Sequence, residues 1–434
     1  MMRTIDLRGH EYSSAELLAL VPRAATDVAV ASETAAALID ELRRGGAEAL
    51  LAQADRFDGG RPPALRVPAE EIAAAVDGLD AAVRTALEET IRRVRTASAA
   101  QVPPAIVTQL APGARIRQRW QPVARVGLYV PGGKAVYPSS VVMNVVPAQV
   151  AGVASIALVS PPQRQHGGHV HPVVLAAAGL LGVSEVYAMG GAGAIGALAY
   201  GVADIGLEPV QLVTGPGNVY VAAAKRLIRG QAGIDAEAGP TDILVIADAS
   251  ADARLIAADL ISQAEHDELA AAVLVTDAPG LATAVADEVA AQAASTTHGD
   301  RVRAALTGPQ SAVVLVDDLA QAADFANAFG PEHLEIQTAD DEAVLARIQN
   351  AGAIFLGAHS PVSLGDYAAG SNHVLPTGGQ ARFAAGLGAS TFLRPQQVVE
   401  YDRDALQAVA ANIAALSDAE VLPAHGDAVR ARFA

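Results

Sequence analysis

From Val126 onward, short apolar runs alternate with stretches of helical periodicity, and this alternation limits the possible folds more than any other feature. Four runs begin 28, 31 and 25 residues apart, at Val126–Val130, Ala154–Ser160, Glu185–Met189 and Val210–Thr214. This spacing fits strand–helix–strand units, whose strands run parallel. A second series follows, at Asp242–Ala247, Ala271–Thr276, Ser311–Val316, Leu334–Ile336 and Ala353–Leu356. The sequence therefore predicts an α/β fold of two tandem Rossmann-like, doubly wound parallel-sheet domains.

The rest of the chain suggests how these domains are bounded. Residues 11–100 have a helical pattern, and a glycine-rich turn after residue 380 leads to one predicted helix, Asp404–Leu416. The last residues are too few to form a core of their own, so they must pack on something else, such as a partner subunit. We expect a helical N-terminal segment (1–25), a first domain (26–125 with 239–380), a second domain (126–238) and a C-terminal tail (381–434).

Composition excludes several classes of function. With 30 basic and 47 acidic residues the net charge is −17, which disfavours both nucleic acids and anionic membranes as partners. The chain has no cysteine, so disulfides, thiolate metal sites and cysteine nucleophiles are excluded. The first residues lack an apolar signal core, and the uncharged stretch Val186–Ala203 has the pattern of a buried strand–turn–helix. We expect a cytoplasmic protein.

Three glycine-rich turns follow predicted strands of the first series, at Pro131–Gly133, Gly191–Gly196 and Gly215–Asn218. In an open α/β sheet the carboxyl ends of the strands are where ligands bind, so together the turns favour a nucleotide-sized ligand. Gly191–Gly196 matches G-x-G-x-x-G, but the acidic residue expected after the next strand is missing. We therefore expect these small residues to allow close approach of a helix to the sheet.

Several polar groups could carry chemistry, although each alone also suits an ordinary turn or helix end. Gln263 and His266 share one helix face, and a carboxylate beside an imidazole is a possible acid/base pair. The remaining candidates are the Glu332–His333 pair, Asp366 and His373 in a glycine-broken loop, and Glu420 and His425 in the tail. His166, His169 and His171 cluster as well, but no carboxylate is near in sequence, and we expect an exposed loop there rather than a metal site.

Taken together and in order, these motifs resemble the histidinol dehydrogenase family over roughly residues 120 to 430. The matching segments are Val126–Gly133, Gly215–Asn218, Gly233–Asp235, Ala238–Pro240, Ser262–His266, Pro331–Glu335, Gly365–Tyr367, Asn372–Pro376 and Ala424–His425. The resemblance implies zinc-dependent, four-electron oxidation of L-histidinol through L-histidinaldehyde to L-histidine with two NAD⁺, the last steps of histidine biosynthesis. It also implies a homodimer with one zinc ion per subunit.

By the same resemblance, the first domain would carry the metal and substrate site and the second the nucleotide. Zinc would be held by Gln263, His266, Asp366 and His425, with His425 supplied by the tail of the other subunit. His333 would be the base for the alcohol, and Glu332 would activate water for the aldehyde. Substrate contacts would come from Thr241, His373, Glu420, His333 and the four zinc ligands, and cofactor contacts from Tyr129, Gly193 and Asn218.

Three positions depart from the family pattern. Gly193 stands where many members have glutamine, so a side-chain bond to the cofactor is missing. Thr241-Asp242 replaces the commoner Ser-Glu, which keeps the hydroxyl. Asp267 follows His266 where glycine is common, and the sequence does not explain it.

Two alternative functions remain open at this point. A related dehydrogenase of another small alcohol, such as a sulfonated diol, would need an added arginine near the site, whereas Glu420 favours an imidazole. A non-catalytic, two-lobed small-molecule binding protein would need neither the metal set nor the base.

Overall fold

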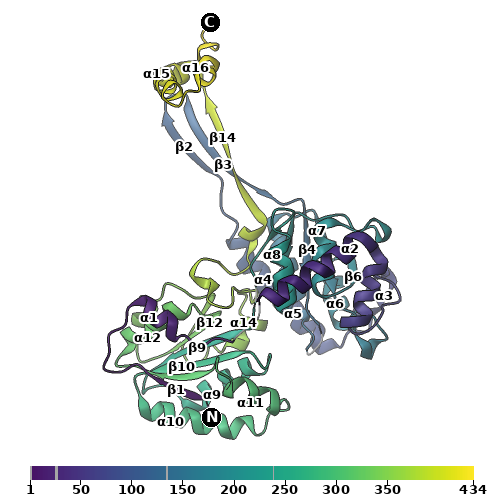
Figure 1. Cartoon of the computed structure of the whole chain (residues 1–434), viewed down its shortest axis with the longest axis vertical. Coiled ribbons are helices and arrows are strands. Elements are labelled where there is room, and N and C mark those ends of the chain that lie inside the picture. Colours follow the sequence, from purple (N-terminus) through teal and green to yellow (C-terminus); the bar gives the residue numbers. More distant parts are fainter. Residues whose placement is uncertain (1, 25–27, 133–134, 238) are drawn as a thin grey trace.

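The computed structural model describes residues 2–24, 28–132, 135–237 and 239–434. Figure 1 shows two α/β bodies side by side and a narrow arm that ends in two helices at the C-terminus. Among the described residues, no helix has both the length and the apolar character needed to cross a membrane. The stretch Val186–Ala203 is a buried strand, turn and helix, as expected.

The first body is built on a six-stranded sheet with the order β1-β11-β10-β9-β12-β13, and its strand pairs are all parallel. The second series of apolar runs is confirmed as strands. The strands are β1 (Arg3–Asp6), β9 (Asp242–Ala247), β10 (Ala271–Thr276), β11 (Ala312–Leu315), β12 (His333–Gln337) and β13 (Ala353–Leu356). The N-terminal segment, expected to be helical, thus also contributes an edge strand.

Helices cover both faces of this sheet, because successive strand residues bury apolar side chains on opposite sides. One apolar core lies under α9 (Ala253–Ala264), α10 (Pro279–Ala293) and α11 (Gly299–Thr307). The other lies under α1 (Ser14–Leu20), α12 (Leu319–Phe329) and α13 (Asp341–Leu345). A short helix, α14 (Val362–Tyr367), contacts α9.

The second body is built on a five-stranded parallel sheet with the order β6-β5-β4-β7-β8. The first series of apolar runs is confirmed here. The strands are β4 (Arg125–Tyr129), β5 (Ser155–Ser160), β6 (Val186–Ala188), β7 (Leu212–Thr214) and β8 (Gly233–Ile234). The helices α5 (Pro138–Ala151) and α6 (Pro172–Leu180) pack on one face, and α7 (Gly191–Tyr200) and α8 (Val219–Leu227) on the other.

The helices between residues 28 and 100 belong to this second body, so our assignment of 26–125 to the domain of 239–380 is wrong. The helix α2 (Val28–Phe57) packs on α7 and α8, α3 (Ala69–Asp77) packs on α6, and α4 (Ala81–Ala100) packs on α5. Their apolar side chains join the two cores around the five-stranded sheet. Helical periodicity predicts that a face is buried but does not say against which sheet.

The small residues of α7 explain one of these contacts. A methyl group at Gly196 would lie 3.0 Å from Leu42 and 3.1 Å from Ile39, and both of these side chains come from α2. A methyl group at Gly193 would collide with the side-chain oxygen of Gln53, also on α2. We had expected these glycines to allow α7 to approach the sheet. They instead allow close packing of α7 against α2.

The arm was not foreseen. It is an antiparallel sheet in the order β14-β3-β2, formed by β2 (Ile106–Ala111), β3 (Ala114–Pro122) and β14 (Leu393–Tyr401). Beyond it lie α15 (Arg403–Ala419) and α16 (Pro423–Arg430), which extend the single helix predicted in the tail. Every residue of β2 is exposed, so the strand lacks the apolar pattern that marks a buried one.

Candidate active site

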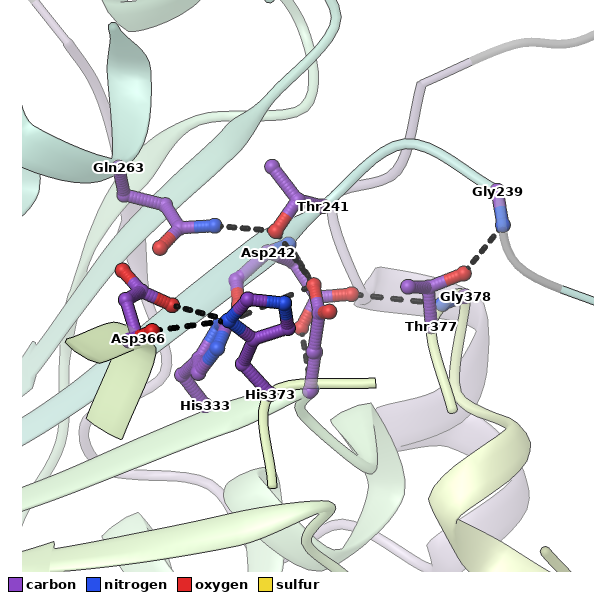
Figure 2. Close-up of polar contacts among 10 residues, drawn as sticks. Gly239, Thr241, Asp242, Gln263, His333, Asp366, His373, Thr377 and Gly378 are labelled. Atoms are coloured by element: carbon purple, nitrogen blue, oxygen red, sulfur yellow. Dashed lines mark hydrogen bonds and ion pairs between the residues drawn. The ribbon is translucent and has the colours of Figure 1, made fainter. Parts of the chain in front are cut away.

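The polar candidates of the first body gather at the amino ends of two neighbouring strands. Thr241 directly precedes β9, Glu332 directly precedes β12, and His333 is the first residue of β12. Because α9 runs antiparallel to the strands it covers, its last turn brings Gln263 to the same edge. Figure 2 shows these side chains converging with Asp366 of α14 and His373 of the following loop.

Glu332 is the centre of the hydrogen bonds at this edge. Its Oε2 accepts from the Thr241 hydroxyl and, at 3.1 Å, from the Asp242 amide. The Glu332 amide in turn donates to Asp242 Oδ1 at 2.7 Å. Glu332 is buried, and burial raises its pKa to about 8, with the charge of Asp366 acting in the same direction. Burial, and then the charge of Glu332, likewise raises the pKa of Asp242 to about 7.

His333 is a buried neutral base. Its Nδ1 lies 3.0 Å from the Asp242 carbonyl, which can only accept, so Nδ1 carries the proton and Nε2 keeps its lone pair. Burial lowers the pKa of His333 and so favours the neutral ring. The sequence placed this histidine in a turn, whereas the structure makes it the first residue of a strand, which fixes its backbone.

His373 is held from both sides by the protein. Its Nδ1 donates to the Asp366 carbonyl at 3.0 Å, and its Nε2 lies 3.0 Å from the Ser140 hydroxyl. Ser140 belongs to α5 of the second body, so this contact joins the two bodies next to the site. Sequence reasoning missed Ser140, because a serine in the first turn of a helix carries no signal of what it faces.

Gln263 provides the clearest sign that a group binds here. Its Nε2 donates to the Thr241 hydroxyl, which fixes the orientation of the amide. Its Oε1 is buried and has no hydrogen-bond partner among the residues that the structure describes. Unpaired buried carbonyl oxygens are costly, so this oxygen is positioned for a ligand. His266 lies nearby, and burial lowers its pKa against the opposing charge of Asp366.

The two tail candidates lie far from these residues within one chain. Glu420 follows the end of α15, and His425 lies on α16. Both side chains are exposed, and Figure 1 shows these helices at the far end of the arm. Within the described parts of the chain, no group of three or more His, Asp or Glu side chains could hold a metal. Gln263 is a glutamine and does not count toward such a group. Of the four expected zinc ligands, the body of the chain therefore contributes only two of these types, His266 and Asp366.

The cofactor candidates line a separate cavity of about 540 Å³ in the second body. It opens at the carboxyl ends of the strands, and Tyr129, Gly193 and Asn218 are among its lining residues. The Tyr129 hydroxyl accepts from the Gly191 amide at 3.2 Å, and Asn218 Oδ1 caps α8. Of the matching motifs, Gly133 and Ala238 lie outside the described residues.

A buried ion pair lies behind the turn that leads to Asn218, one of the residues that line this cavity. Lys225 pairs with Asp235, and both side chains are almost fully buried. Lys225 Nζ also donates to the Gly215 carbonyl at 3.0 Å, and Asp235 Oδ2 accepts from the Gly215 amide at 2.9 Å. The pair thereby fixes the turn that leads to Asn218. The sequence motifs contained Asp235 but did not reveal its partner on α8.

The three clustered histidines have structural contacts. His169 Nδ1 lies 2.9 Å from a Glu71 carboxylate oxygen on α3, and His171 Nδ1 accepts from the Val173 amide at the start of α6. The rings of His166 and His171 pack edge to face, 4.5 Å apart. The loop is half-buried rather than exposed, because α3 covers it, and a carboxylate is near in space although none is near in sequence.

A nucleotide-sized cavity in one α/β body and a buried histidine–carboxylate site at the edge of the other are the features of a two-domain α/β dehydrogenase. The family described as histidinol dehydrogenase matches residues 21–433. The chain is 70% identical over 432 residues to the histidinol dehydrogenase of Leifsonia xyli, covering 100% of this chain and 99% of the relative. It is 57% identical to that of Mycolicibacterium smegmatis, covering 100% and 98%.

The fold agrees with these sequence matches. The crystal structure of histidinol dehydrogenase from Elizabethkingia anophelis superposes with a TM-score of 0.92 at 30% identity and covers 100% of this chain and 98% of that one. The chain therefore belongs to the histidinol dehydrogenase family and is an NAD-dependent oxidoreductase.

A second pair of buried carboxyl groups lies next to the site, on α9 and β12. Asp259 is one turn before Gln263 on α9, and Glu335 is two residues after His333 on β12. Their carboxyl groups lie close enough to influence each other's pKa, and Gln337 Nε2 donates to Glu335 Oε1 at 2.8 Å. Burial and then the charge of Asp259 raise the pKa of Glu335 to about 9. The pair therefore retains a proton at neutral pH.

This proton makes stability depend on pH. The pKa of Glu335 rises from an ordinary 4.5 to about 9 on folding, so its contribution is complete below pH 4.5 and is lost as the pH rises toward 9. Glu335→Gln keeps a donor for Asp259 and does not titrate. Between pH 5.5 and 8.5, urea denaturation should show the variant losing about 4 kcal/mol less stability than the unmodified protein.

The matched control is Glu342→Gln, which removes an exposed carboxylate in the first turn of α13. It should leave the pH dependence unchanged. An unaltered pH dependence in Glu335→Gln as well would show that Glu335 is ionised in the folded protein.

Proposed function

We propose that this chain is a cytoplasmic, zinc-dependent enzyme that oxidises L-histidinol through L-histidinaldehyde to L-histidine with two NAD⁺. The observation that carries the metal and substrate assignment is the buried Oε1 of Gln263, which has no partner among the described residues and lies near Asp366 and His333 (Figure 2). His266 is close enough to Asp366 and His333 to feel their charges. Family membership supports the same substrate. The reaction would complete histidine biosynthesis.

The donor set suits zinc. Gln263, His266, Asp366 and His425 of the partner subunit would supply two oxygens and two nitrogens, without a thiolate, as catalytic zinc tolerates. The set lies at the carboxyl end of α9, where the helix dipole favours a cation. When bound, the ion would hold the imidazole and amino nitrogens of the substrate and so position the alcohol carbon for hydride loss to the dinucleotide.

His333 would remove the proton of the substrate hydroxyl. Its Nε2 is the free nitrogen, because Nδ1 is bound to the Asp242 carbonyl, and burial keeps the ring neutral before the reaction. A base in this state accepts a proton without first losing one. The fixed tautomer directs Nε2 away from β9.

Glu332 would accept a proton from the water that attacks the aldehyde. Thr241 and the Asp242 amide both bind Oε2, so Oε1 is the oxygen left for water. With its pKa raised to about 8, the ionised form of Glu332 is a stronger base than an ordinary carboxylate, and the ionised fraction grows as the pH rises toward 8. Thr241 and His373 border the same space, and they would contact the substrate together with Glu420 of the partner subunit.

The second-body cavity would hold the dinucleotide against Tyr129, Gly193 and Asn218. Its volume of about 540 Å³ suits part of such a molecule, and it lies at the edge of the sheet where nucleotides bind in α/β folds. Gly193 can offer only its backbone there.

A second copy of this chain would complete the site. The arm exposes apolar side chains on β2, on α15 and in the turn after α15, including Ile106 (51%), Val107 (58%), Leu416 (65%) and Val421 (82%). Large exposed apolar side chains on a narrow arm favour burial against a partner. The arm that carries Glu420 and His425 away from its own body would deliver them to the body of the partner.

The direct test is the amount of NADH formed per L-histidinol consumed, before chelation, after chelation and after zinc is restored. We expect two NADH per substrate, lost on chelation and recovered with zinc. Tightly bound zinc without turnover of histidinol would contradict the substrate assignment. Turnover of sulfonated diols would then indicate the related dehydrogenase, and no turnover of any alcohol would indicate a binding protein.

Glu332→Gln should separate the two half-reactions. Aldehyde oxidation should fall by about 10²–10⁴-fold, the usual contribution of a general base, while alcohol oxidation should be affected less. His333→Asn should instead slow the alcohol step and leave the metal in place. The half-reactions are measured separately as NADH formation from histidinol and from histidinaldehyde. Equal losses in both for Glu332→Gln would rule out its role with water.

Mixing two inactive variants tests the shared site. In dimers of His266→Ala with His425→Ala, one of the two sites has all its ligands, so random mixing after refolding should restore about a quarter of the normal activity per subunit. The control pair is His266→Ala with Asp366→Ala, both in the body of the chain, which should restore no activity. His425→Ala refolded alone should stay inactive, and no recovery with His266→Ala would contradict an exchanged tail.

The control pair gives the same result whether the tail is exchanged or not, whereas the test pair does not. If a site used His425 of its own chain, every mixed dimer of His266→Ala with His425→Ala would contain two defective sites. His266→Ala with Asp366→Ala would then also have two defective sites. With an exchanged tail, the second pair still has His266 and Asp366 in the same body, so each body keeps one defect and activity is not restored.

A further inference from the structure

Asp58 places a carboxylate inside the dinucleotide cavity. It directly follows the last residue of α2, it is half-buried, and it lines the cavity together with Tyr129. It accepts a hydrogen bond from the amide of Gly190, the residue before α7. No resemblance or motif in the sequence pointed to this residue.

The surrounding backbone is shaped around this carboxylate. A methyl group at Gly190 would lie 2.6 Å from Asp58 Oδ1, and one at Gly59 would lie 2.3 Å from the Pro162 carbonyl. The Gly59 amide donates to that same carbonyl at 3.0 Å. Glycine at both positions therefore allows the end of α2 to approach the turn before α7 and to bring Asp58 into the cavity.

This arrangement changes what the start of α7 can bind. In an ordinary G-x-G-x-x-G turn, the first amides of the helix bind the pyrophosphate. Here the Gly190 amide is bound by Asp58 and the Gly191 amide by the Tyr129 hydroxyl. A diphosphate at this point would meet a negative charge, so another part of the dinucleotide must face Asp58.

The chemistry of the cavity favours a group with hydroxyl donors. Among the described residues that line it, the charged ones are Asp58 and the exposed Arg164. Burial raises the pKa of Asp58 to about 7, as expected of a carboxylate that has lost water without gaining a cation. The two hydroxyls of a ribose can donate to it, which is how acidic residues bind ribose in other dinucleotide sites.

The position of Asp58 in the sheet indicates which ribose it faces. The contact between His373 and Ser140 puts the substrate side of the second body at the start of α5, which follows β4. Gly190 follows β6, which is separated from β4 by β5 and forms the edge of the sheet. A dinucleotide with its nicotinamide toward the substrate therefore has its adenosine end toward β6 and Asp58.

We propose that Asp58 binds the hydroxyls of the adenosine ribose and so selects NAD⁺ against NADP⁺, whose 2′-phosphate would meet the carboxylate. This inference rests on the proposed use of the cavity by NAD⁺. The residue that would select NAD⁺ thus follows α2, a helix outside the sheet. In ordinary dinucleotide sites the acidic residue follows a strand instead.

The test is direct binding, by calorimetry in the absence of substrate, of NAD⁺, NADP⁺ and ADP-ribose to the whole protein and to Asp58→Asn. We expect the unmodified protein to prefer NAD⁺. Asp58→Asn should weaken NAD⁺ and ADP-ribose binding by about 10-fold, the usual effect of losing a charged hydrogen bond, and should reduce the preference over NADP⁺ by a similar factor.

The matched control is Asp55→Asn, which removes the same charge from the exposed side of α2, one turn earlier. It should bind all three ligands as the unmodified protein does. If Asp58→Asn does not fold, as judged by its circular dichroism, Asp58→Ser gives the same test with a smaller polar side chain.

The outcomes separate this inference from the proposed function. An unmodified protein that binds neither NAD⁺ nor ADP-ribose would contradict the proposed use of the cavity itself. A protein that binds NAD⁺ but does not prefer it to NADP⁺ would overturn the role of Asp58. So would a preference that persists undiminished in Asp58→Asn.

Discussion

The reciprocal hydrogen bonds between Asp242 and Glu332 hold the amino ends of β9 and β12 together, and the rest of the site depends on them. Each residue donates its amide to the carboxylate of the other. The same two residues fix their neighbours, since Glu332 binds the Thr241 hydroxyl and the Asp242 carbonyl binds His333. Thr241 then orients Gln263. One exchange between adjacent strands thereby sets a metal-binding oxygen, a base and a carboxylate in a single arrangement.

The two sheets present their sites at opposite ends. The cavity of the second body lies at the carboxyl ends of its strands, whereas the polar site of the first body lies at the amino ends. The contact of His373 with Ser140 joins the polar site of the first body to the start of α5, which follows β4 in the second body. The arrangement suits a reaction in which one domain holds the acceptor and the other holds the group that is oxidised.

The sequence predicted the strands well because they are fully buried, and burial on both faces leaves continuous apolar runs such as Val126–Val130. It failed for β2, whose residues are all exposed, and for β14, which pairs with β3 from the far end of the chain. The sequence identified the site residues that lie in polar motifs, but it did not identify Ser140 or Asp58. Both contribute one ordinary side chain whose role depends on the approach of a distant segment.

The arm pairs strands that lie between α4 and β4 with one strand near the end of the chain. Leu393–Tyr401 pairs with Ala114–Pro122, so β3 has no partner on that side until nearly all of the chain has been synthesised. Phe392 and Leu393 are buried in the same core as α5 and fix the base of the arm. During synthesis the two α/β bodies can therefore acquire their cores first, and the arm is among the last parts to form. Loss of the chain from β14 onward would leave both bodies folded and the arm incomplete.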